Sequence, residues 1–194
     1  MRIYSLRKEG AWFCVGMEED DSVSFSSFSP KSLNHALQAY GGFPGEGWKV
    51  EEKPSPEAKE ILEALAEAYM GRETNVKPPL ALGRLSPFTR RVLEAVREVP
   101  RGFTATYRGV AEAVGVPRGA RAVGNAVAGN PFSLLVPCHR IIKSDLTLGR
   151  YGLGASVKLM LLKREGVKIY LSPSSRKLRV DVQHVLKKGT RRLA

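Results

Sequence analysis

The chain has 194 residues, with 31 Lys and Arg against 19 Asp and Glu and a net charge of +12. With 43% hydrophobic and 26% charged residues, it has the composition of a globular protein, which excludes a disordered chain. No apolar run is long enough to span a membrane, and residues 1–10 lack the features of a secretory signal. Cys14 and Cys138 are too few for a disulfide framework, so we expect a soluble cytoplasmic protein with reduced thiols.

Charge is distributed unevenly along the chain. Residues 1–80 carry 9 basic and 13 acidic side chains, residues 81–170 carry 15 and 5, and residues 171–194 carry 7 and 1. This division indicates that the back of the chain meets a polyanion. Nucleic acid is favoured over a membrane, because no segment has the pattern of an interfacial amphipathic helix. A solvated basic face without a partner is the alternative.

The front of the chain is predicted to form a small antiparallel meander followed by two helices. Its strands are three short runs rich in aromatic and β-branched residues, Arg2–Leu6, Ala11–Met17 and Ser22–Phe28. Ser29-Pro30 offers the start of a helix at Lys31–Tyr40, which Gly41–Gly45 ends. Ser55-Pro56 starts the second helix, whose apolar residues recur at helical spacing.

A linker is predicted at Thr74–Leu85, which contains two consecutive prolines. We therefore divide the chain into an N-terminal α/β domain at 1–80, a second domain at 81–170 and a basic C-terminal extension at 171–194. In the extension, apolar and charged residues alternate across Leu178–Val182, a pattern typical of an edge strand. We expect this extension to add electrostatic affinity for DNA.

After the linker the pattern becomes helical. Ser86-Pro87 predicts a helix start, and two shorter helices follow at Tyr107–Val114 and Ala120–Ala128, joined by a turn with Gly and Pro. This outline is that of a helix-turn-helix, although small helical domains that only pack show it too. Four arginines gather in the same stretch: Arg101, Arg108, Arg118 and Arg121.

The second helix of this pair is made almost entirely of small residues, including Ala120, Ala122, Gly124, Ala126 and Ala128. A helix faced with Ala and Gly lets its backbone approach DNA closely and offers few side chains that read bases. It therefore favours recognition of shape and phosphates over a specific operator. Tight packing in a core is the equally simple alternative.

The reactive chemistry is predicted at Pro137-Cys138-His139-Arg140, after an apolar strand at Phe132–Val136. A cysteine beside a histidine suits a thiol nucleophile, because the thiolate reacts and a neighbouring base or cation lowers its pKa. Adjacent side chains on extended backbone point to opposite faces, so we expect His139 to reach Cys138 through a water molecule. An inert buried cysteine is the alternative. Two cysteines without Cys-x-x-Cys spacing argue against zinc.

These motifs together resemble those of the O6-alkylguanine-DNA alkyltransferases. The likeness covers about residues 86–167, and its motifs are Arg121–Gly124, Gly129–Pro131, Pro137–Ile142, Gly149–Gly152 and Leu161–Gly166. Several motifs in this order and spacing are specific. The resemblance implies an α/β (α+β) protein, with a small RNase-H-like N-terminal domain and a helical, winged-helix-like alkyltransferase domain that contains the helix-turn-helix.

The resemblance also implies a DNA repair reaction. The protein would flip O6-alkylguanine, and less well O4-alkylthymine, out of duplex DNA and transfer the alkyl group irreversibly to Cys138. His139 would take the thiol proton through water, and Glu165 would orient His139. Tyr107 would donate a proton toward the leaving guanine, and Asn130 would hold the turn before the active-site strand. Each molecule would act once, as a monomer, without metal or cofactor.

Further positions follow from the same resemblance. Those implied to contact DNA are Arg108, Ala120, Arg121, Ala122, Gly124, Asn125 and Ala128, with Arg121 filling the gap left by the flipped base. Those implied to line the pocket are Ser133, Ile141, Tyr151, Gly152 and Lys158. Ser133, Asn125 and Leu153 depart from residues common in relatives, which affects the expected range of lesions and not the reaction.

Two other classes of function remain as alternatives. One is a module that binds alkylated DNA without transferring the alkyl group, which the presence of Cys138 disfavours. The other is a helix-turn-helix regulator, which the Ala/Gly face of the reading helix disfavours.

Overall fold

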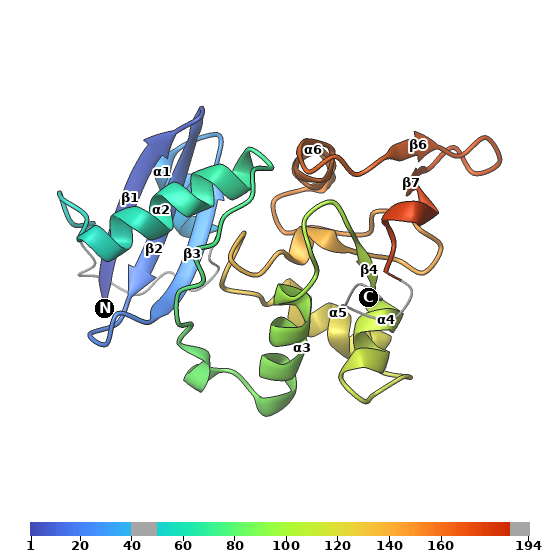
Figure 1. Cartoon of the computed structure of the whole chain (residues 1–194), viewed down its shortest axis with the longest axis horizontal. Helices are drawn as coiled ribbons and strands as arrows, with labels where there is room; N and C mark the ends of the chain where they lie inside the picture. Colours follow the sequence, from blue (N-terminus) through green and yellow to red (C-terminus); the bar gives the residue numbers. More distant parts are fainter. Residues whose placement is uncertain (40–49, 187–194) are drawn as a thin grey trace. The chain divides into compact units, whose positions relative to one another are not determined.

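The computed structural model describes residues 1–39 and 50–186, and the chain forms two compact units (Figure 1). The first unit comprises residues 1–84 and 131–135, and the second comprises residues 85–130 and the chain from 136 onward. The described part of the C-terminal extension thus belongs to the second unit. Within the described ranges, the model contains no helix with the length and apolar character needed to cross a membrane.

The first unit is built on a three-stranded antiparallel sheet in the order β1 (Arg2–Lys8), β2 (Ala11–Met17) and β3 (Val23–Ser29). The predicted meander is confirmed. Two residues with positive φ, Glu9 (51°) and Gly10 (73°), join β1 to β2. Positive φ at both central residues is the geometry of a tight hairpin turn that follows the strand twist.

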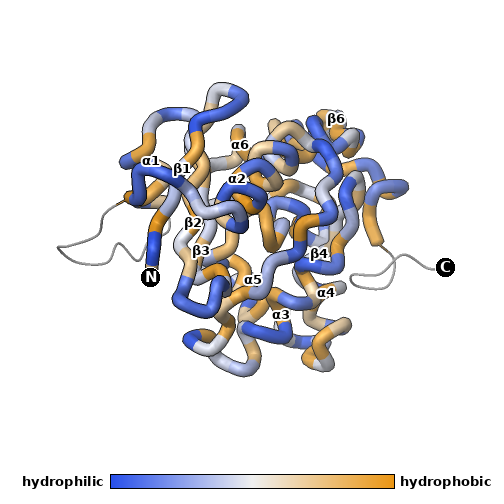
Figure 2. Tube along the Cα trace, turned by 60° about the vertical axis from the view of Figure 1, so that its left-hand side comes forward, coloured by the Kyte–Doolittle hydropathy of each residue, from blue (hydrophilic) through white to orange (hydrophobic). Residues whose placement is uncertain are grey.

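Helices cover both faces of this sheet (Figure 1). On one face, α2 (Pro56–Tyr69) brings the Tyr69 ring to 5.5 Å from Phe13 and 5.4 Å from Phe28, measured between ring centroids. On the other face, α1 (Leu33–Gln38) packs over Cys14. Hydrophobic and hydrophilic segments alternate along the helices (Figure 2). Because both faces are covered, every residue of β3 is buried.

The two helices of this unit compare differently with their predicted starts. Ser55 caps α2 as predicted, and its side chain accepts a hydrogen bond from the Ala58 N–H. The first helix begins later than predicted: its cap is Ser32, and Ser29 accepts instead from the Lys31 N–H. A serine at either position can cap a helix, and the tertiary contacts select between them. Tyr40 and the predicted Gly41–Gly45 break lie outside the described residues.

Two irregular segments pair with β3. Within the predicted linker, Leu80 forms a parallel bridge with Val23, and a short 3₁₀ turn η1 (Leu82–Arg84) follows. Residues 131–135 form a second segment, in which Phe132 bridges Ser26. The chain therefore leaves the second unit after α5 (Ala120–Ala128), pairs with β3, and returns. These bridges satisfy backbone groups that a free sheet edge would leave open.

The second unit contains the predicted helices α3 (Pro87–Arg97), α4 (Tyr107–Ala113) and α5, followed by α6 (Ala155–Arg164). The Ser86 side chain caps α3 by accepting from the Thr89 N–H, as predicted. Helix α5 packs against both α3 and α4. Two short strands, β4 (Ala105–Thr106) and β5 (Ile141–Ile142), run parallel beside these helices.

The C-terminal extension folds into the second unit. Strands β6 (Ile169–Leu171) and β7 (Leu178–Val180) form an antiparallel hairpin, and a 3₁₀ turn η3 (Val182–His184) follows. The alternating pattern predicted the strand, but Val182 lies in η3. On its other side β7 bridges Thr147, so at that point it has a partner on both edges. Val180 is fully buried in the core, together with residues of β5 and α6.

Candidate active site

The predicted nucleophile lies on a tight turn and not at the end of a strand. Cys138 opens the 3₁₀ turn η2 (Cys138–Arg140), and the apolar run before it forms turns and a single bridge in place of the expected strand. Three features interrupt extended backbone in this run. Pro131 and Pro137 have no N–H to donate, and Leu134 has a φ of 70°.

The Cys138 thiol is buried and partnered by polar groups of the second unit. Burial raises its pKa above the ordinary 9.0, while a hydrogen bond with the Asn130 side chain and the charge of Lys158 act in the opposite direction. Asn130 also donates from Nδ2 to the carbonyl oxygen of Val136 at 3.0 Å. Asn130 therefore ties the backbone that enters η2 to the thiol, consistent with its expected position at this turn.

His139 and Glu165 form a buried pair, with 2% of each side chain exposed. The distance from His139 Nε2 to Glu165 Oε1 is 2.8 Å. Burial lowers the pKa of His139 below 6.5, so the imidazole is neutral near pH 7 and donates its Nε2–H to the carboxylate. The remaining ring nitrogen, Nδ1, is then an acceptor, and it is buried without a hydrogen-bond partner in the structure. This orphaned nitrogen is the atom available to take a proton.

Glu165 has a second partner that the sequence reasoning did not assign, Arg140. The Arg140 guanidinium contacts both carboxylate oxygens, with Nε at 3.1 Å from Oε1 and 3.0 Å from Oε2, and Nη2 at 2.8 Å from Oε1. Burial alone would raise the pKa of Glu165, but the charges and hydrogen bonds of His139 and Arg140 overcome it and lower this pKa to about 2. Arg140 stands directly after His139, but its partner is on another element, so spacing offered no signal.

Lys158 is a fully buried cation on α6. Its Nζ donates to the carbonyl oxygen of Ile141, and burial lowers its pKa to about 8, while the Cys138 charge acts to raise it. Lysine is rarely buried without a compensating charge or hydrogen bonds. Its position between a backbone carbonyl and the thiol therefore joins Lys158 and Ile141 to the site, as the sequence predicted.

Two tyrosines complete the surroundings of the thiol. The Tyr151 ring meets the His139 ring edge-on at 6.5 Å between centroids, and its hydroxyl oxygen is buried without a geometric hydrogen-bond partner in the structure. Burial raises the pKa of Tyr151 well above 10, and the nearby Cys138 adds to this effect. Burial, followed by the Cys138 charge, also raises the pKa of Tyr107, the first residue of α4. Both phenols are therefore held protonated.

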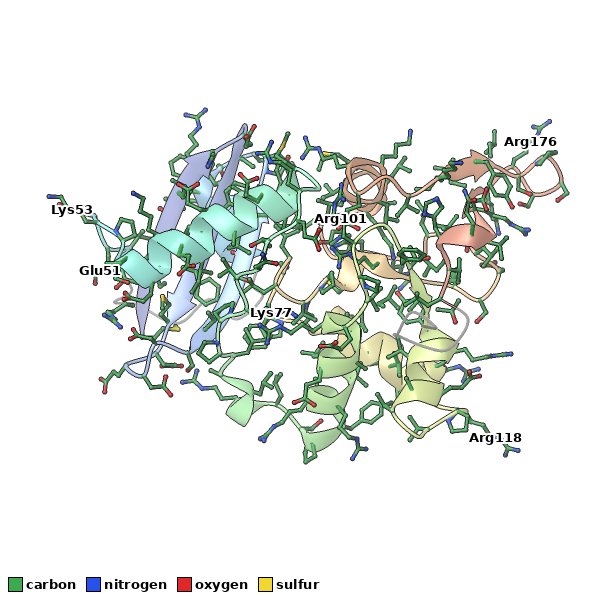
Figure 3. All side chains as sticks on the ribbon, viewed as in Figure 1. Glu51, Lys53, Lys77, Arg101, Arg118 and Arg176 are labelled. Atoms are coloured by element: carbon green, nitrogen blue, oxygen red, sulfur yellow. The ribbon has the colours of Figure 1, made fainter. Side chains whose placement is uncertain are left out.

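Helix α5 has one buried and one exposed face. Its buried residues are Val123, Ala126 and Val127. Its exposed face carries the predicted DNA-contacting residues Arg121, Ala122, Asn125 and Ala128, with Ala120 and Gly124 half-buried between the faces. The helix therefore uses only part of its small residues for packing. Arg108 is exposed on α4, and Arg118 points away from the turn between α4 and α5 (Figure 3).

Two predicted pocket residues are not drawn into this cluster. Ser133 belongs to the first unit, where its N–H donates to the Ser26 carbonyl oxygen at 3.0 Å. Gly152 is exposed, and a Cβ added there would meet no atom within 4 Å. The second unit brings together the other predicted residues of the thiol's surroundings: Tyr107, Asn130, Cys138, His139, Ile141, Tyr151, Lys158 and Glu165.

Residues 87–167 match the family model described as "6-O-methylguanine DNA methyltransferase, DNA binding domain". The chain is 36% identical over 121 residues to a methylated-DNA--protein-cysteine methyltransferase of Methanosarcina acetivorans, covering 62% of this chain and 75% of that protein. It is 39% identical over 118 residues to the protein of the same name from Methanothermobacter thermautotrophicus, covering 60% of this chain and 65% of that protein.

Solved structures agree over most of the chain. The O6-methylguanine-DNA methyltransferase of Pyrococcus kodakaraensis has a TM-score of 0.65 at 28% identity, covering 85% of this chain and 99% of that one. Mycobacterium tuberculosis OGT in complex with DNA has a TM-score of 0.67 at 25% identity, covering 85% and 92%.

The fold and the site define a protein with a buried, histidine-linked acceptor thiol next to a helix-turn-helix. The chain belongs to the methylated-DNA--protein-cysteine methyltransferase family. It spans less than two thirds of several curated relatives, including 26% of the bifunctional protein Ada of Escherichia coli and 39% of the Mus musculus protein.

Proposed function

We propose that this protein repairs DNA by transferring the alkyl group of O6-alkylguanine to its own Cys138, once per molecule. The observation that carries the proposal is the buried set of Cys138, His139 and Glu165, in which the carboxylate occupies Nε2 and leaves Nδ1 of the base free. A nucleophile, a base and an acid that orients the base are the parts that thiol chemistry needs.

The reaction is balanced within these residues. The Cys138 proton passes to His139 Nδ1 through a water molecule, a sulfur–carbon bond to the alkyl group forms, and the bond from that carbon to guanine O6 breaks. The departing guanine receives a proton from Tyr107, and the proton now held by His139 balances the phenolate. A thioether has no good leaving group, so Cys138 is not regenerated and the protein is consumed.

DNA delivery is assigned to the basic second unit. Exposed Arg108 and Arg121 contact phosphates or the gap in the stack, and the small face of α5 lies against the minor groove with little sequence preference. The alkylated base must leave the stack, because a thiol buried in the protein is out of reach of a base inside the duplex. Tyr151, Gly152 and the Ile141 carbonyl are proposed to receive it, with O4-alkylthymine as a poorer substrate.

The finer architecture and setting are part of the same proposal. The meander with α2 supports an RNase-H-like description of the first unit, and α4, α5 and the β6–β7 hairpin support a winged-helix-like description of the second. The residues that carry the chemistry lie in one chain, which supports action as a monomer. The acceptor thiol must stay reduced to react, which supports a cytoplasmic location.

Intact-protein mass spectrometry tests the proposal. The protein is incubated with a duplex containing O6-methylguanine under reducing conditions, and a gain of one methyl group per molecule is expected. Cys138→Ala should show no gain, and Cys14→Ala should behave like the parent, since burial raises the Cys14 pKa to about 12. A parent protein that binds this duplex and never gains mass would be a lesion-binding module, and the proposed transfer would be wrong.

A further inference from the structure

The carboxylate that orients the base is shared with a second cation. Glu165 ends α6, and its two oxygens accept from both His139 and Arg140. The opposite side of the Arg140 guanidinium is also engaged, because Nη1 donates to the Val99 carbonyl oxygen at 2.6 Å, just after α3. With 15% of its side chain exposed, Arg140 is nearly as enclosed as the pair that it contacts.

Sharing the carboxylate changes the charge balance around the base. An ionised carboxylate alone beside a buried histidine favours the imidazolium, because an opposite charge within about 4–6 Å stabilises the charged form. A guanidinium on the same carboxylate already neutralises that charge, and it repels a second proton on the imidazole. The resting histidine then keeps Nδ1 unprotonated, as a base requires.

The other groups around His139 do not supply this balance. The charged and titratable side chains that face it are Cys138 and Arg140 on η2, Tyr151 in the loop before α6, and Lys158 and Glu165 on α6. Cys138 and Tyr151 are neutral when protonated, and Lys158 donates to the Ile141 carbonyl and makes no contact with the carboxylate. Arg140 is the cation that meets Glu165 directly.

We propose that Arg140 is a positioning residue which, by sharing the Glu165 carboxylate, keeps His139 neutral at rest and so ready to accept the Cys138 proton. This inference deepens the proposed function and rests on it. It differs from a purely mechanical role, in which Arg140 only fastens η2 to α3 and α6. A mechanical tie affects the reaction equally at every pH, whereas a charge effect moves the pH at which His139 gains its proton.

The test measures the His139 pKa by ¹⁵N NMR of the imidazole ring in the full-length protein without DNA. In Arg140→Gln this pKa is expected to rise by about one unit or more. The pH midpoint of the single-turnover methyl transfer rate should rise with it, so the variant loses roughly tenfold in rate at pH 6 relative to the parent while approaching it at pH 8.5. Arg140→Lys keeps the charge without the two-pronged geometry and should retain the parental midpoint.

Lys163→Gln is the matched control, because it removes a positive charge near the same end of α6 from an exposed side chain. It should leave the His139 pKa unchanged. An Arg140→Gln protein with the parental His139 pKa, slowed equally at every pH, would overturn the proposal. If this variant does not fold, the parent decides: a His139 that is protonated at pH 7 contradicts the proposal. The titration uses no DNA, so failure of methyl transfer in the parent would overturn only the proposed function.

Discussion

At the scale of single residues, the site keeps charges where burial works against them. Glu165 and Lys158 are both buried, and burial opposes the ionised form of each. The outcomes differ because their partners differ. Glu165 has two partners that favour its anion, so its pKa falls to about 2, whereas Lys158 has a neutral carbonyl acceptor and its pKa falls to about 8. Lys158 is therefore the weakly held charge of the site.

The stability of the protein should record this weakly held charge. The folded pKa of Lys158 is about 8 against an ordinary 10.5, so between these values the unfolded chain binds a proton that the folded chain has released. This group therefore makes the folded state more stable as pH rises through that window. From pH 8 to 9.5 we expect the free energy of unfolding of the parent to gain roughly 2 kcal/mol relative to Lys158→Met.

Urea unfolding at several pH values measures this difference. Lys163→Met is a suitable control, because its side chain is exposed on the same helix. Parallel pH curves for the parent and Lys158→Met would show that Lys158 titrates normally.

At the scale of elements, the exposed face of α5 links packing to DNA binding. Gly124 lies inside this helix, and a Cβ added there would meet no protein atom within 4 Å. Glycine inside a helix costs about 0.5–1 kcal/mol relative to alanine. Nothing in the described structure offsets that cost, which is consistent with a backbone that another molecule approaches closely.

Gly124→Ala should therefore separate stability from affinity. We expect the free energy of unfolding to rise by about 0.5–1 kcal/mol, because the unfolded chain loses freedom and the helix gains a better former. We expect the affinity for duplex DNA, measured by fluorescence anisotropy, to fall severalfold. A variant that is more stable and binds DNA as tightly as the parent would show that α5 does not approach the duplex at this position.

The elements also show how far sequence reasoning reaches. Alternation and capping residues predicted β1 to β3, α2, α3, α4 and α5, because these signals act over a few residues. The turn at Cys138 was wrongly expected to follow a strand, since the positive φ of Leu134 is set by tertiary structure. In the site, the family spacing identified Cys138, His139 and Glu165. It did not identify the contact of Arg140 with Glu165, which joins positions 25 residues apart.

At the scale of the whole molecule, the basic C-terminal extension has two parts with different roles. Residues up to Leu186 are integrated into the second unit: Val180 is fully buried, and Val185 bridges Thr104. The four basic residues beyond Leu186 lie outside the described structure. The expectation that the extension adds DNA affinity therefore applies most directly to this last part.

A chain that ends at Leu186 tests this expectation without removing core residues. Its melting temperature should match the parent, while its DNA affinity should fall and the slope of log K against log salt should become shallower by about one or more. Salt-dependent anisotropy titrations measure both. An unchanged slope would exclude phosphate contacts by these residues. A chain that ends at Leu171 also loses Val180 and should unfold more easily, which shows why the shorter deletion is needed.

The passage of residues 131–135 through the first unit has a consequence for how the two units can be separated. A protease that cuts the segment between α2 and α3 removes one covalent link, yet the nicked product still carries a piece of the second fragment paired to Ser26 in the first. Severing the polypeptide there should leave a complex that elutes as one species. Likewise, a gene fragment encoding only residues 85–194 would carry five orphaned residues into solution, immediately before the turn that holds its reactive sulfur.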